Sequence, residues 1–298
     1  MRKALLAAAL GLAVSVTAVR AEPDAAYGAY QRGHYLAAFR EATLRLEKNK
    51  ADAPAMTLLG ELYNQGLGVP MSPEKAADWY RLAAERGDAH ALAALGLMAL
   101  DGRGMKKDTA QAKAWLEQAA AKNEPVACHN LALLLLSSAA DADLTRAADL
   151  LRKASEAEIP DAQHALGVLY LQGRGVPRDP AQAARYFERA ARNGSSTGEV
   201  EYAILLFNGD GVTKNEAKAA RYFRSAAAKG NAIAQNRLAR MLAAGRGVPQ
   251  NKVDAAAWHL LASAQGLADA WLDDALKDMT PEEKTRAEKV AAERLGMR

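Results

Sequence analysis

Cysteine is almost absent from this chain of 298 residues, which contains only Cys128. A lone cysteine excludes an internal disulfide framework of the kind that holds small secreted domains together. Two roles remain for Cys128: a small, partly buried apolar residue, or a thiol that reacts or forms a disulfide with another molecule. The fold must therefore depend on buried apolar side chains, and half of the residues are hydrophobic.

Aromatic residues are also scarce, at 6% of the chain, and runs of β-branched residues are nearly absent. Alanine, the residue with the highest helix propensity, is abundant instead. Together these features favour an all-α fold. A charged fraction of 25% is ordinary for a soluble protein.

Long hydrophobic runs are missing except at the N-terminus, which reads MRKALLAAALGLAVSVTAVRA. Arg2 and Lys3 precede the apolar run, and Val19 and Ala21 supply the small residues that a signal peptidase accepts. This pattern predicts a secretory signal peptide over residues 1–21, with cleavage after Ala21. The alternative is an uncleaved membrane anchor, but the apolar run is shorter than the about 20 residues that span a bilayer.

An excess of basic residues is only apparent. The formal net charge is +4, but without Arg2, Lys3 and Arg20 the 39 basic residues fall to 36, against 35 acidic ones. A nucleic-acid partner would require a basic patch or stripe. We therefore expect no nucleic-acid partner.

The rest of the chain repeats one pattern every 35 or 36 residues. A small residue recurs at Gly60, Gly96, Ala132, Gly167, Ala203 and Ala239. A large residue recurs in the same register at Trp79, Trp115, Leu150, Tyr186, Tyr222 and Trp258, where we expect it to fill the space between hairpins. A period of this length is typical of solenoids, in which each unit buries its apolar face against the next.

Each copy reads as a helical hairpin. The first helix ends at a glycine pair, as at Gly66 and Gly68, because glycine tolerates the left-handed conformation that ends helices. The second helix then begins at a residue that favours the N-cap position. These predicted N-caps are Ser72, Asp108, Asp143, Asp179, Asn215 and Asn251. The second helix ends at a glycine in four copies, at Asn123 in the second, and before Pro160 in the third.

The first copy carries the pattern nearly complete, with Ala55, Leu59, Gly60, Tyr63, Gly66, Gly68, Val69, Lys75, Ala76, Trp79, Tyr80, Ala83, Ala84 and Gly87. These residues resemble the Sel1-like repeat family, a branch of the tetratricopeptide-like helical hairpins. Six copies cover residues 53–267. The resemblance implies an all-α, right-handed α-solenoid of about six hairpins. The third copy departs from the pattern, because it is one residue shorter and lacks the glycine pair.

The two ends read as caps of the stack. Residues 22–52 look like a tetratricopeptide-type hairpin with a charged, solvent-facing end. Residues 268–298 suggest capping helices, with a capping box formed by Thr280 and Glu283 and a proline at the first helical position. Solenoids need such polar ends for solubility.

The sequence offers little chemistry. It contains no phosphate-binding loop, no G-x-S-x-G and no H-E-x-x-H motif. His129 and His164 occupy equivalent positions in neighbouring copies. They are either polar residues on an inner face or part of a zinc site, which would need at least one further ligand. We expect no enzyme activity, cofactor or metal.

A helical wheel places an apolar strip on the side of the first helices that lines the concave face of such solenoids. The strip consists of Leu97, Leu100, Leu133, Leu136, Val168, Leu171, Ile204 and Phe207, flanked by His129 and His164. An apolar strip with a polar rim is a usual mark of a partner site. The alternative is that these side chains pack between adjacent first helices.

The resemblance implies an exported scaffold or regulatory adaptor that binds a protein partner, such as an envelope or sensor protein. It suggests a periplasmic location, with full secretion as the alternative. The competing function is an envelope enzyme or binder that acts on peptidoglycan fragments. Secreted relatives to which a β-lactamase activity has been attached carry paired cysteines in each repeat, which this chain lacks.

Overall fold

The computed structural model describes residues 24–137 and 140–296, so the expected signal peptide (residues 1–21) and its cleavage near Ala21 lie outside the described residues. Within these ranges the chain forms sixteen helices and no strand. The helices are α1 (Ala25–Gln31), α2 (Tyr35–Lys48), α3 (Ala53–Gln65), α4 (Pro73–Ala84), α5 (Ala89–Asp101), α6 (Thr109–Ala121), α7 (Pro125–Leu136), α8 (Asp141–Glu156), α9 (Pro160–Gln172), α10 (Pro180–Arg192), α11 (Ser196–Asn208), α12 (Glu216–Ala228), α13 (Ala232–Ala244), α14 (Lys252–Ala264), α15 (Ala270–Ala275) and α16 (Pro281–Arg294).

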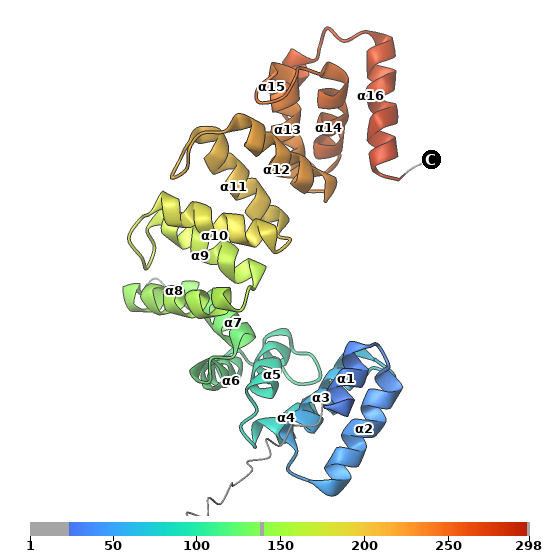
Figure 1. Ribbon diagram of the computed structural model, residues 1–298, viewed down its shortest axis with the longest axis vertical. Coiled ribbons are helices and arrows are strands. Elements are labelled where there is room, and N and C mark those ends of the chain that lie inside the picture. Colours follow the sequence, from blue (N-terminus) through green and yellow to red (C-terminus); the bar gives the residue numbers. More distant parts are fainter. Residues whose placement is uncertain (1–23, 138–139, 297–298) are drawn as a thin grey trace, which may run out of the picture.

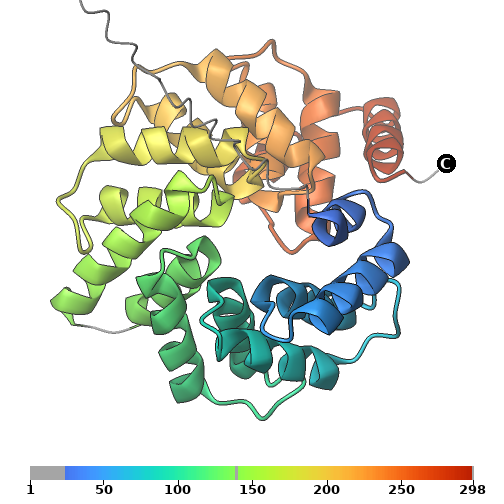
Figure 2. The same cartoon turned by 60° about the horizontal axis from the view of Figure 1, so that its bottom comes forward.

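Helices α3 to α14 form six hairpins, each of which packs on the next. The hairpins follow one another along the long axis in Figure 1 and wind around a central opening in Figure 2. First helices of neighbouring hairpins touch directly, α5 with α7 and α9 with α11, as elements do on the inner side of a curved stack. This arrangement confirms the expected all-α solenoid.

In three hairpins a glycine on the first helix (Gly60, Gly96 or Gly167) makes room for a large side chain on the second helix. A Cβ atom at Gly60 would lie 2.6 Å from the ring of Tyr80, and one at Gly167 would lie 2.6 Å from the ring of Phe187. In the first five repeats the residue directly after the large residue expected from the sequence is the more deeply buried of the two, whereas in the sixth the expected Trp258 is itself buried. Tyr80, Leu116, Leu151, Phe187 and Phe223 are at most 2% exposed, whereas Trp79, Trp115, Tyr186 and Tyr222 are half-buried.

The helix ends follow the predicted pattern in five repeats. Gly66 ends α3 at φ +69°, and its N–H donates to the carbonyl of Leu62. The N–H of Ser72 donates back to the carbonyl of Tyr63 at 2.9 Å, which closes the loop. Five expected N-caps are confirmed by their side-chain hydrogen bonds to the next helix: Ser72, Asp108, Asp179, Asn215 and Asn251.

The second glycine of each loop seats one hairpin on the previous one. A Cβ atom at Gly247 would lie 2.5 Å from the backbone of Glu216, in the first turn of α12. A Cβ atom at Gly211 would overlap the carbonyl group of Pro180, in the first turn of α10. These glycines are required both by their positive φ and by the close approach of two backbones.

The third repeat corrects two predictions. Asp143 is not an N-cap, because α8 begins earlier, at Asp141, and Asp143 lies in its first turn, where an acidic side chain favours the helix dipole. The left-handed residue after α8 is Glu158, at φ +58°, and Pro160 instead starts α9.

Hydrogen bonds from Asn193, Arg189 and Gln163 lower the pKa of Glu158 to about 2. This carboxylate thus joins the third repeat to the fourth.

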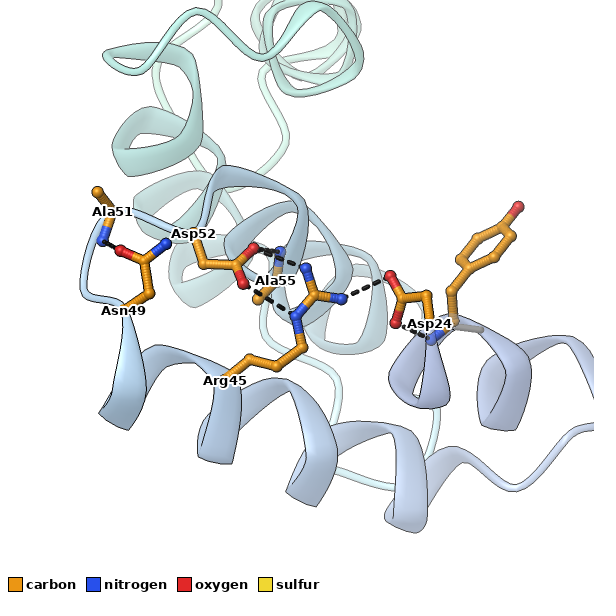
Figure 3. Close-up of polar contacts among 7 residues, drawn as sticks. Asp24, Arg45, Asn49, Ala51, Asp52 and Ala55 are labelled. Atoms are coloured by element: carbon orange, nitrogen blue, oxygen red, sulfur yellow. Dashed lines mark hydrogen bonds and ion pairs between the residues drawn. The ribbon is translucent and has the colours of Figure 1, made fainter. Parts of the chain in front are cut away.

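At the N-terminal end, one arginine ties three helices together (Figure 3). Arg45 of α2 donates to Asp52 through Nε and Nη2, at 2.9 and 2.8 Å, and to Asp24 through Nη1. Asp24 caps α1, and Asp52 caps α3 by accepting from the N–H of Ala55. The pair of α1 and α2 is thereby fastened to the first repeat.

At the C-terminal end, Arg240 of α13 forms a bidentate ion pair with Asp269, the N-cap of α15. Its Nε and Nη2 donate to the carboxylate at 2.6 and 2.8 Å. Helix α16 packs on α14, where Arg294 lies 4.0 Å from the ring centroid of Trp258. The capping box of Thr280 and Glu283 at the start of α16 is confirmed.

Changing Gly211 to alanine tests the seating contact. A left-handed alanine costs about 1–2 kcal/mol wherever it occurs. The added overlap with α10 should destabilise by a further 1–3 kcal/mol or so. The matched control is Gly33→Ala, because Gly33 has φ +76° but no atom lies within 4 Å of the position that a Cβ would take there. Urea unfolding should show a clearly larger loss for Gly211→Ala, and equal losses would contradict the contact.

Loss of an N-cap gives a second test. Asp179→Ala should lower the free energy of unfolding by about 1 kcal/mol, because the N–H groups of Ala181 and Gln182 lose their acceptor. Asp143→Ala, which removes an acid without removing a cap, should have the smaller effect. A larger loss for Asp143→Ala in thermal or urea unfolding would refute the assignment of the two residues.

Candidate binding groove

The apolar strip lies on α5, α7, α9 and α11, the first helices of the second to fifth repeats. All of its predicted members are half-buried except Leu133, which is 45% exposed. These are the helices whose direct contacts, α5 with α7 and α9 with α11, place them on the inner side of the stack.

The strip also contributes to packing. Leu100 and Leu136 pack against the core of the middle repeats. Val168, Leu171, Ile204 and Phe207 pack against the core of the C-terminal repeats. The two interpretations of the strip are therefore not exclusive, since one side of these residues packs on the core while part of their surface stays open.

The two histidines beside the strip are buried enough to favour the neutral form. Burial lowers the pKa of His129 and that of His164. The ring centroid of His164 lies 5.6 Å from that of Phe187. Across residues 24–137 and 140–296, no group of three or more His, Cys, Asp or Glu side chains could hold a metal ion. Cys128 is fully buried, which raises the pKa of its thiol and supports its apolar role.

Two hollows in the described part of the chain include residues of the strip, one towards each end. The N-terminal hollow, of about 220 Å³, includes Leu97 together with Glu61, Tyr80 and Arg103. The Tyr80 hydroxyl donates to the Glu61 carboxylate at 2.6 Å. Burial and this hydrogen bond raise the pKa of Tyr80 well above its usual value.

The C-terminal hollow is larger, at about 370 Å³, and combines an apolar floor with a basic rim. Its lining residues are Ile204, Phe207, Asn208, Phe223, Arg237, Arg240, Met241, Ala244, Arg246 and Trp271. They come from α11, α12, α13, the loop after α13, and α15. The strip thus opens into this hollow through Ile204 and Phe207, while Leu100, Leu133, Leu136, Val168 and Leu171 line neither hollow.

The three arginines of the C-terminal hollow differ in their partners. Arg240 is held by Asp269, and its guanidinium lies 5.2 Å from the ring centroid of Trp271. Arg246 pairs with Glu216 and lies 4.2 Å from the ring centroid of Phe207. Arg237 is exposed and forms no hydrogen bond or ion pair with any other described residue.

The sequence pattern does not reveal this hollow. It places Arg240 at the polar end of the strip and does not single out Arg237, Arg246 or Trp271. The spacing of Arg237 and Arg240, three residues apart on one helix, is a signal for a basic face. The position of Trp271 over that face depends on how α15 folds back, which no local pattern shows.

Comparison with solved structures finds similar folds. The crystal structure of a Sel1 repeat protein from Oxalobacter formigenes matches with a TM-score of 0.68 and 27% identity, over 80% of this chain and 98% of that one. The protective antigen c5321 of uropathogenic Escherichia coli, which displays an SLR fold, matches with a TM-score of 0.59 and 24% identity, over 92% of this chain and 68% of that one. Comparison with curated proteins finds no match.

The family comparison locates the repeats along the sequence. The model of the Sel1 repeat matches residues 53–88, 89–124, 125–158, 160–195, 197–231 and 232–267. Sel1 repeat proteins generally act as scaffolds for protein–protein interactions. The matches cover well over half of the chain and agree with the six hairpins of the structure, so the protein belongs to the Sel1 repeat family.

Proposed function

We propose that this protein is an exported, periplasmic or secreted scaffold that binds a protein partner on its concave face. The observation that carries the proposal is the apolar strip, which repeats on four consecutive first helices and keeps part of its surface open. Monomeric soluble proteins rarely leave contiguous apolar surface exposed unless it binds something. An amphipathic helix or an extended segment of the partner fits such a surface.

Export rests on the N-terminal sequence, where a positive start, an apolar run and small residues at a cleavage site follow in order. None of the described helices has the length and apolar character needed to cross a membrane. An envelope or sensor protein that faces the same compartment is the class of partner we propose.

A binding role without catalysis is also part of the proposal. Glu61, which lines the N-terminal hollow, is engaged by Tyr80, and Asp269, which lies beside the C-terminal hollow without lining it, is engaged by Arg240. The hydrogen bonds from Arg240 and Asn236 lower the pKa of Asp269 well below its usual range, so this carboxylate is a poor base. These side chains suit structural roles better than proton transfer.

Processing provides a direct test of export. In a Gram-negative host, the full chain should be cleaved after Ala21, so that the mature protein begins at Glu22 and is recovered from the periplasm or the medium. N-terminal sequencing and fractionation measure this. Recovery of a chain that still begins at Met1 from the cytoplasm would contradict export.

Leu133→Asp tests the concave face with little risk to folding, because this side chain is 45% exposed. Leu171 and Phe207 are less suitable, since both pack against the core. We expect Leu133→Asp to keep the melting temperature within a few degrees and to reduce capture of the partner from an envelope extract at least about tenfold, as a buried charge at an interface would.

The matched control is Leu82→Asp, at a 38% exposed leucine on α4, the second helix of the first repeat. It should leave capture unchanged. Mass spectrometry identifies the partner and quantifies both variants against the unaltered protein. Equal capture by Leu133→Asp and the unaltered protein would show that the strip is not the binding surface.

A further inference from the structure

We propose that the C-terminal hollow binds an acidic peptide segment of the partner, with an aromatic or large aliphatic side chain in the hollow and a neighbouring carboxylate on Arg237. This inference rests on the proposed function and specifies the chemistry of the segment that is bound. It is carried by three features of the hollow: its apolar floor, its unpaired basic group and its continuation along the surface.

The floor is built to take an apolar side chain. Met241 and Phe223 are 3% and 2% exposed at its base, and Ile204 and Phe207 form the wall that continues the strip. Trp271 of α15, 46% exposed, completes the apolar lining. A volume of about 370 Å³ is within the range of sites that bury a large side chain or a small ligand.

The charge at the rim favours an anion. In the described part of the chain, no acidic residue lines this hollow, although three arginines do. Two of the three are already neutralised, Arg240 by Asp269 and Arg246 by Glu216. Arg237 remains as an uncompensated charge beside an apolar surface, and a segment bound in the hollow would displace part of the water that screens a new ion pair. A carboxylate is its natural complement, because guanidinium binds carboxylates through two parallel hydrogen bonds.

The surface beyond the rim fits an extended peptide segment better than a small molecule. Arg237, Arg240 and Trp271 also border a further, shallower hollow, which runs over Ile233, Leu267, Ala268 and Asp269, the last already paired with Arg240. The two hollows therefore share Arg237, Arg240 and Trp271. An extended segment that places one apolar side chain in the deeper hollow would carry its next residues across Arg237 into the shallower one.

The indole N–H of Trp271 provides an NMR signal that reports on binding in the C-terminal hollow. The chain has four tryptophans, so its indole N–H groups give four signals in a proton–nitrogen correlation spectrum, and Trp271→Phe assigns one of them. The probe is an acetylated and amidated peptide, GSEEFEEGS. Its matched controls are GSQQFQQGS, which lacks the charge, and GSEEGEEGS, which lacks the anchor.

We expect the Glu-Phe peptide to shift the Trp271 signal in a saturable way, and both control peptides to bind about tenfold or more weakly. Arg237→Gln should weaken the Glu-Phe peptide about tenfold, as expected for loss of a hydrogen-bonded ion pair. Arg221→Gln, which removes an exposed arginine on α12, should leave binding unchanged.

Three results would overturn the inference: no shift of Trp271 at about 1 mM peptide, equal binding of the glutamine peptide, or the same shift with inorganic phosphate at similar concentrations. If any of these occurs while Leu133→Asp still reduces capture of the partner, the acidic-segment inference is wrong and the proposed function stands. If Leu133→Asp also has no effect, the concave face itself is not the binding surface.

Discussion

The stack depends on one contact, in which the second glycine of a loop lies directly against the backbone at the start of the second helix in the preceding hairpin. Gly104 lies against the backbone of Pro73, and Gly211 and Gly247 repeat this contact further along the chain. Because backbone meets backbone, the step from one hairpin to the next varies little with side-chain identity. The same step repeated along the chain produces the winding of Figure 2 and keeps the first helices on the inside. The third repeat has no such glycine, although Arg146 of α8 pairs there with Glu117 of α6.

Inside the stack each hairpin packs between two others, but the two ends need closing contacts of their own. Arg45 closes one end by joining α1, α2 and α3, and Asp269 closes the other by joining α13 to α15. The second closure has a further effect, because it holds Trp271 beside Arg240 at the edge of the C-terminal hollow. The element that ends the solenoid thus also supplies part of the lining of this hollow.

Much of the fold was predictable from the sequence because each repeat carries its own start and stop signals. The caps at Ser72 and Asp179 are local features, and the structure confirms them. The cap expected at Asp143 failed although Asp favours the N-cap position, because the loop there lacks the glycine pair and α8 begins earlier, at Asp141. Trp79 and Tyr80 are both aromatic, so only packing against Gly60 decides which is buried. The C-terminal hollow was not predictable, since it combines side chains from four helices.

Hydrogen–deuterium exchange of the complex with the captured partner tests the central claim most directly, because it reports on every backbone segment without any substitution. Binding on the concave face predicts slower exchange in the first helices α5, α7, α9 and α11, with α6, α8, α10 and α12 unchanged. Slower exchange confined to these second helices would contradict the account, because it would place the partner on the outer face of the solenoid.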